Sequence, residues 1–288
     1  MDRVVEHRGC RIAYSVAGTG PAVLFIQGIG VQGAGWRPQT ADLAAGHTCL
    51  SFDNRGMGRS QPVGAEITVA QMADDARAVL DAERVAAAHV VGHSLGGPVA
   101  LQLALDARHR VRSLALLCTF TGGRTAAPLT PRMMWLGFRA RVGTRSMRRR
   151  GFLRLVLAPG ATADAGELAE LFGHDLADQP PVVAAQLRAL RATDLTDRLA
   201  ELTGLPALVV TGAHDPIAPP AAGRALRDGL AGSRYVEVAD ASHGLPITHA
   251  ARVNGLLREH LSAVESARQP SGGGPEYAEP SAAADGGA

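Results

Sequence analysis

Short apolar runs recur along the chain, and segments with helical spacing separate most of them. Runs rich in β-branched residues and bounded by turn residues predict buried strands. The first segment, VVEHRGCRIAYSV, indicates a hairpin. The strands expected after it are AVLFI (22–26), TCLSFD (48–53), AHVVGH (88–93), VRSLALLC (111–118), PALVVTG (206–212) and RYVEVA (234–239).

Four of the intervening segments have the apolar spacing or the capping residues of helices. They are ITVAQMADDARAVLDAERV (67–85), SLGGPVALQLALDARH (94–109), PPAAGRALRDGLAG (219–232) and THAARVNGLLREHL (248–261). This alternation predicts an α/β fold, a mostly parallel, eight-stranded, doubly wound sheet with helices on both faces. Right-handed crossovers place the loop after each parallel strand at one edge, where a functional site is expected.

The alternation stops between about Thr121 and Leu199, where Gly, Pro, Arg, Met and Trp occur in a mainly helical pattern. Because a strand pattern resumes at residue 206, this segment predicts an insertion within one sheet. We expect residues 1–120 and 200–265 to form the core and residues 121–199 to form a helical cap over the site edge. Residues 266–288 hold too few large apolar side chains to order, which predicts a disordered tail.

At 288 residues and 46% hydrophobic content, the chain can hold one large core with an inserted cap. No apolar run is long enough to span a membrane, and MDRVVEHRGCR lacks the apolar stretch of a secretory signal. We therefore expect a cytoplasmic monomer or homodimer that acts on a small molecule, with no membrane or nucleic-acid partner. The cysteines, Cys10, Cys49 and Cys118, lie far apart, which predicts buried thiols and no metal site.

All 29 basic residues are arginines. The absence of lysine excludes a Schiff base and a P-loop, both of which need a lysine amine. Arg124 to Arg154 contains nine arginines and no acidic residue. This run indicates either a solvated helix face or a patch for an anionic substrate, carrier or surface.

The segment FIQGIGVQGAGW (25–36) follows a predicted strand and spaces Gly28, Gly30 and Gly33 as GxGxxG. Asp53, at the end of the next strand, stands near the position of the ribose-binding acid in a dinucleotide site. Such a site needs the helix to open at the glycines, however, because the pyrophosphate binds the free N–H groups of its first turn. Gly35 and Pro38 favour a helix that begins near Pro38, which is too late, so we expect no cofactor.

GHSLGG places Ser94 between a predicted strand and a predicted helix. A serine on such a tight turn needs small neighbours, and the turn lifts its hydroxyl clear of the sheet as a nucleophile. The structural alternative is a serine that caps the helix.

A nucleophilic serine needs a base, and the base needs a group that holds its tautomer. Asp215 and His243 follow two successive predicted strands, so the three residues occur in the chain order of the nucleophile-elbow architecture. Taken singly, Asp215 also fits a turn residue and His243 a loop residue. His93 adjoins Ser94 on a strand, where neighbours point to opposite faces, and His89 is too far from His93 to share a metal.

Attack on a carbonyl creates an oxyanion that needs two preorganised donors. The backbone N–H of Leu95, directly after the nucleophile, is one. The glycine loop after the earlier strand offers the Ile29 N–H as the other. The loop would then serve an oxygen anion instead of a pyrophosphate.

These residues, together with DNRGMGRS (53–60), GAHDP and ASHG, resemble the α/β-hydrolase superfamily over about residues 3–262. Within it the chain is similar to the serine-nucleophile, small-molecule branch of esterases, 3-oxoadipate enol-lactonases and cofactor-free perhydrolases. The resemblance implies a Ser94, His243 and Asp215 triad, an oxyanion hole of Ile29 and Leu95, a lid at the insertion and no cofactor. It also implies that Asp53 and Arg55 belong to a structural turn.

Where most members of that family have histidine before the oxyanion loop, this chain has Gln27. Its amide either bridges the loop or adds a donor to the substrate. The predicted substrate-binding residues are Gln27, Trp36, Phe120, Met133, Met134, Trp135 and Phe138, although such an apolar stripe is also typical of lid core.

The leading hypothesis is a serine hydrolase that cleaves a small hydrophobic ester, lactone or thioester through an acyl-enzyme. The alternatives are a carbon–carbon bond hydrolase or biosynthetic cyclase with the same triad, and a ligand receptor with little turnover.

Overall fold

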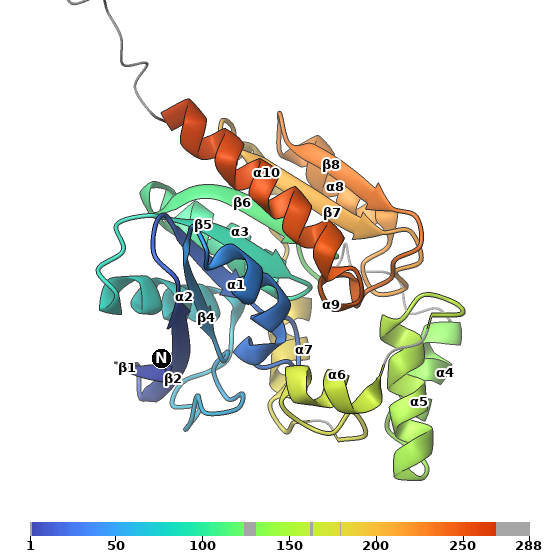
Figure 1. The fold of residues 1–288 in the computed structure, drawn as a ribbon. Coiled ribbons are helices and arrows are strands. Elements are labelled where there is room, and N and C mark those ends of the chain that lie inside the picture. The colour runs from blue at the N-terminus through green and yellow to red at the C-terminus, as the bar shows by residue number, and fades with distance from the viewer. Residues whose placement is uncertain (1, 124–130, 162–163, 179, 269–288) are drawn as a thin grey trace, which may run out of the picture.

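A computed structural model describes residues 2–123, 131–161, 164–178 and 180–268 (Figure 1). Its single sheet has the strand order β1-β2-β4-β3-β5-β6-β7-β8. The strands are β1 (Asp2–His7), β2 (Cys10–Ala17), β3 (Ala22–Ile26), β4 (Thr48–Phe52), β5 (Ala88–His93), β6 (Val111–Leu117), β7 (Ala207–Gly212) and β8 (Arg234–Val238). The β1–β2 and β2–β4 pairs are antiparallel and all the others are parallel, which confirms the predicted fold class.

Helices cover both faces of the sheet because successive strand residues point to opposite sides. In β3, Leu24 and Ile26 enter one hydrophobic core, and Val23 and Phe25 enter a second. The first core lies under α2 (Val69–Ala82), α3 (Gly96–Asp106) and α8 (Pro220–Gly229). The second lies under α1 (Arg37–Leu43), the short α9 (Leu245–Thr248) and α10 (Ala250–Arg268), which crosses the front of the sheet in Figure 1.

The segment between β6 and β7 is helical, as its pattern predicted. It contains α4 (Pro131–Arg139), α5 (Arg145–Val156), α6 (Ala165–Phe172), α7 (Val183–Arg191) and the 3₁₀ helix η3 (Thr196–Leu202). In Figure 1, α4 and α5 form a hairpin to one side, and α6 and α7 lie below the strands. We refer to α4 through α7 as the cap helices.

One sequence-based boundary is confirmed and another needs correction. The helix expected near Pro38 begins at Arg37, and a 3₁₀ turn, η1 (Gly33–Trp36), precedes it. The tail was predicted to start at residue 266, but α10 continues to Arg268. Glu265 holds this end of the helix, because its carboxylate accepts hydrogen bonds from Arg112 at 2.8 Å and from His89 at 2.9 Å. Residues 269–288 lie outside the described part of the chain.

The three cysteines are buried and unpaired, as predicted. Within the described ranges no helix is both long enough and apolar enough to cross a membrane.

Three histidines with lowered pKa values make the fold sensitive to acid. Burial lowers the pKa of His89 and His260 to about 4 and that of His93 to about 3. In the unfolded chain a histidine titrates near 6.5, so on acidification the unfolded state takes up protons first. Stability is therefore present above about pH 6.5 and is lost as the pH falls below it.

We expect each of these histidines to reduce the free energy of unfolding by about 1.4 kcal/mol per pH unit below pH 6.5. For His260 this is about 2 kcal/mol between pH 7.5 and pH 5. Urea unfolding at the two pH values measures the difference. In His260→Leu the pH dependence should be shallower by that amount, and an unchanged dependence would contradict the assignment.

Candidate active site

Ser94 occupies a strained turn between β5 and α3. Its φ of +53° lies in the left-handed region, which non-glycine residues adopt rarely. The turn is tight, since a Cβ on Gly92 would lie 2.4 Å from the Gly96 carbonyl oxygen and one on Gly96 would lie 2.1 Å from that of Ile26. The N-cap position of α3 is Leu95, without a side-chain cap, so the alternative in which Ser94 caps the helix is wrong.

The loops after β7 and β8 bring Asp215 and His243 to Ser94. His243 Nε2 lies 3.0 Å from Ser94 Oγ, and His243 Nδ1 lies 2.8 Å from Asp215 Oδ2. All three residues are buried. The other carboxylate oxygen, Asp215 Oδ1, accepts backbone N–H groups of Ile217 and Ala218, both at 2.8 Å. The carboxylate is therefore fixed with one oxygen directed at the imidazole.

Two backbone amides beside Ser94 are available to a ligand. Among the described residues, neither the Ile29 nor the Leu95 N–H donates to an acceptor. The glycine loop reaches the serine closely, because a Cβ on Gly28 would lie 2.9 Å from Ser94 Cβ. The arrangement can hold a carbonyl oxygen between a hydroxyl nucleophile and two N–H donors.

Gln27 bonds the backbone of the glycine loop. It is buried, and its Oε1 accepts the Gly28 N–H at 3.0 Å. Its backbone carbonyl accepts a hydrogen bond from Asn54 Nδ2 at 2.9 Å. These contacts support the loop-bridging interpretation of Gln27.

His93 is a residue whose part in the site the sequence did not reveal. Its Nε2 lies 2.9 Å from the His243 carbonyl oxygen, and the two rings are 4.9 Å apart. Burial lowers the pKa of His93 to about 3, so its ring is neutral and donates through Nε2. The ring supports the His243 loop from below. Strand alternation argued against His93 as the base, but it gave no signal for this contact with the His243 loop.

Asp53 does not fit a ribose-binding role. Its Oδ1 accepts the Gly33 N–H at 2.8 Å, and its Oδ2 accepts the Arg59 N–H at 3.1 Å. Arg55 is fully buried in an ion pair with Asp75. Asp53 thus joins the Gly33 and Arg59 backbones, and Arg55 also donates to the Arg8 and Val63 carbonyls. These are the contacts of a structural turn, the role that the resemblance implied.

The predicted apolar pocket residues are not gathered in one wall. Trp36 and Phe120 lie in the hydrophobic cores, with Trp36 packed against Phe25 at 5.2 Å. On α4, Met134, Trp135 and Phe138 are more than half exposed, and the side chain of Met133 lies outside the described part of the chain. A substrate-binding role for these five side chains and Met133 stays a prediction.

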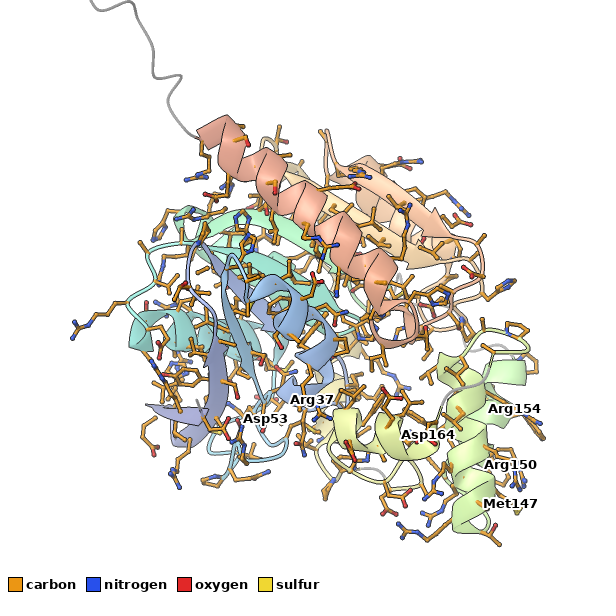
Figure 2. All side chains as sticks on the ribbon, in the orientation of Figure 1. Arg37, Asp53, Met147, Arg150, Arg154 and Asp164 are labelled. Carbon is orange, nitrogen blue, oxygen red and sulfur yellow. The ribbon has the colours of Figure 1, made fainter. Side chains whose placement is uncertain are left out.

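Part of the arginine run is neutralised within the cap. Arg145 and Arg149 pair with Asp175 at 2.9 and 2.6 Å. Figure 2 shows Arg150 and Arg154 on the outer side of α5, directed away from the sheet. This distribution is typical of a solvated helix face.

Two further features bear on ligands. In the described ranges, no group of three or more His, Cys, Asp or Glu side chains could hold a metal ion. A surface hollow of about 550 Å³ lies between α2 and α3, with Arg8, Asp74 and Arg110 in its wall. None of the predicted site residues lines this hollow, so it is separate from Ser94.

Comparison with known proteins shows the family of this chain. Residues 21–250 match the family described as the alpha/beta hydrolase fold. RutD of Variovorax paradoxus, provisionally named a carbamate hydrolase, is 34% identical over 258 residues, which cover 88% of this chain and 96% of RutD.

Two solved structures are also similar. The enol-lactonase of Burkholderia xenovorans is 27% identical, with a TM-score of 0.74 over 90% of this chain and 100% of its own. A thermophilic esterase of Thermogutta terrifontis is 27% identical, with a TM-score of 0.75 over 92% of this chain and 99% of its own. The chain therefore belongs to the α/β-hydrolase family and is a hydrolase of that fold.

Proposed function

We propose that this protein is a serine hydrolase that cleaves a small carboxylic ester, lactone or thioester through an acyl-enzyme. The observation that carries the proposal is the unbroken chain from Ser94 Oγ through His243 to the Asp215 carboxylate, at 3.0 and 2.8 Å. It lies beside two N–H groups without an acceptor in the described residues. Similarity to an esterase and an enol-lactonase supports this class of substrate.

The reaction follows from the positions of these atoms. His243 Nε2 takes the Ser94 proton as Oγ bonds to the acyl carbon, and Asp215 stabilises the resulting imidazolium. The carbonyl oxygen becomes an oxyanion, which accepts the N–H groups of Ile29 and Leu95. His243 then returns the proton to the leaving oxygen or sulfur as its bond to the acyl carbon breaks. A water attacks the acyl-enzyme by the same route and releases Ser94 and the acid.

A carbamate is a second candidate substrate, because RutD, which carries that provisional name, is similar along nearly all of its length. A carbamate carbonyl can undergo the same attack by Ser94. A carbamate differs from a carboxylic ester only in that nitrogen, instead of carbon, is bonded to the carbonyl carbon.

A fluorophosphonate probe tests the proposed nucleophile. We expect one probe per chain, located by mass spectrometry on the peptide that contains Ser94, with loss of fluoride.

In parallel, p-nitrophenyl esters of graded acyl length and p-nitrophenyl carbamates should separate the two candidate substrates by kcat/KM. A folded protein that takes up no probe would favour the low-turnover receptor. Labelling without turnover of any ester, lactone or carbamate would favour the carbon–carbon hydrolase or the cyclase.

A further inference from the structure

The cap helices hold the oxyanion loop at Gly30 from two sides. Gln186 Oε1, on α7, accepts the Gly30 N–H at 3.0 Å. His174 Nε2, just after α6, lies 2.7 Å from the Gly30 carbonyl oxygen, to which it donates. Both contacts come from chain segments more than 140 positions away from the loop. Gly30 itself has a φ of +71°, a conformation that its lack of a Cβ permits.

The cap packs closely around this glycine. A Cβ on Gly30 would lie 3.1 Å from Val183 Cγ2, one helical turn before Gln186. The next loop residue, Val31, joins a small hydrophobic cluster with Phe172 and its neighbours from α6. Gln32 adds a hydrogen bond from its backbone N–H to the Phe172 carbonyl at 3.3 Å. The α6 and α7 helices lie beside the loop in Figure 1.

Successive peptide groups of the loop are fixed in turn. The Gln27–Gly28 peptide is held at its oxygen by Asn54 and at its N–H by the Gln27 side chain. The Ile29–Gly30 peptide is held by Gln186 through the Gly30 N–H. Between them stands the Gly28–Ile29 peptide, whose N–H is the proposed oxyanion donor. Its direction therefore depends on a core contact before it and a cap contact after it.

We propose that Gln186 and His174 are positioning residues, through which the cap sets the direction of the Ile29 N–H toward the oxyanion. This inference rests on the proposed hydrolase function and adds a task for the cap beyond covering the site. Gln186 is fully buried, and its Nε2 has no partner among the described residues. The proposed effect of Gln186 on the loop therefore depends on the hydrogen bond that its Oε1 accepts from the Gly30 N–H.

The matched test compares two buried glutamines. Gln186→Met keeps the length of the side chain and removes the acceptor. Gln71→Met removes a buried glutamine on α2 that bonds Asp75 and Arg8 and does not contact the loop. For Gln186→Met we expect kcat on a p-nitrophenyl ester to fall about tenfold or more, with KM and Tm close to those of Gln71→Met. Complete loss of one oxyanion donor, about 10²- to 10³-fold, is the upper bound.

His174 gives an independent comparison. His174→Gln can still donate to the Gly30 carbonyl, whereas His174→Phe cannot. We expect the phenylalanine variant to lower kcat and the glutamine variant to recover most of it. Equal kcat values for the two variants would overturn the assignment of His174.

Hydrogen exchange of the 27–31 peptide tests the contact between the cap helices and the loop independently of catalytic activity. The loop amides should exchange about tenfold faster in Gln186→Met than in wild type, because the Gly30 N–H loses its acceptor. They should be unchanged in Gln71→Met. Unchanged exchange in Gln186→Met would overturn the cap contact, and faster exchange with unchanged kcat would overturn its link to the oxyanion. If wild type neither labels nor turns over, the proposed function fails, and exchange alone still decides whether the cap holds the loop.

Discussion

Replacement of Ser94 by alanine should reduce ester turnover by about 10⁴- to 10⁶-fold. The variant keeps the N–H groups of Ile29 and Leu95, so substrate binding and some stabilisation of the carbonyl oxygen remain. It loses Oγ, which lies 3.0 Å from His243 Nε2 and is the proposed nucleophile. We expect KM to change little, because the loss occurs in the covalent step.

The control for this variant is Ser113→Ala. Ser113 is a buried serine on β6 that bonds His89 at 2.7 Å and lies outside the proposed site. Its removal should leave kcat within a few-fold of wild type. The fluorophosphonate label should disappear in Ser94→Ala and persist in Ser113→Ala. Substantial turnover by Ser94→Ala that is free of wild-type enzyme would refute the assignment of Ser94 as the nucleophile.

Asp215→Asn should lower kcat by about 10⁴-fold while the fold is retained. The reason lies in the two backbone N–H groups of Ile217 and Ala218, which both donate to Oδ1. In the variant the amide oxygen must face these donors, so the amide NH₂ faces His243 Nδ1. The imidazole then carries its proton on Nε2 and cannot accept the one from Ser94.

Asp53→Asn provides the matched control, since Asp53 also is buried and accepts two backbone N–H groups. It does not contact a histidine of the site, so kcat should stay within several-fold of wild type even if Tm falls. If kcat falls to a similar extent in both variants, the effect of Asp215→Asn would come from general disruption of the loops and not from the orientation of His243. Steady-state kinetics with thermal unfolding of each variant separates these outcomes.

The candidate nucleophile, base and acid could be located from the sequence because each lies in the turn or loop that follows a strand with a plain apolar pattern. Ser94 has the additional signal of Gly92 and Gly96, which a tight turn requires. Parallel strands place such residues at one edge, so distance along the chain did not matter. The pocket was harder to predict, since an apolar stripe on a helix such as α4 does not show which way the helix faces.

The supporting contacts could not be predicted for a related reason. His93, His174 and Gln186 each contact a loop of the candidate site through one hydrogen bond to a backbone group of a distant residue. A backbone N–H or carbonyl has no sequence signature, and the partner of each side chain is set by how distant segments pack together.

By itself the sequence determined the sheet, its strands and the order of the three candidate catalytic side chains, because hydrophobic periodicity and turn residues act over short distances. Only the tertiary structure decided which faces of the cap helices meet the loop, and which amides near Ser94 lack acceptors. Those features depend on the packing of segments far apart in the chain, where small rotations of a helix exchange one set of contacts for another.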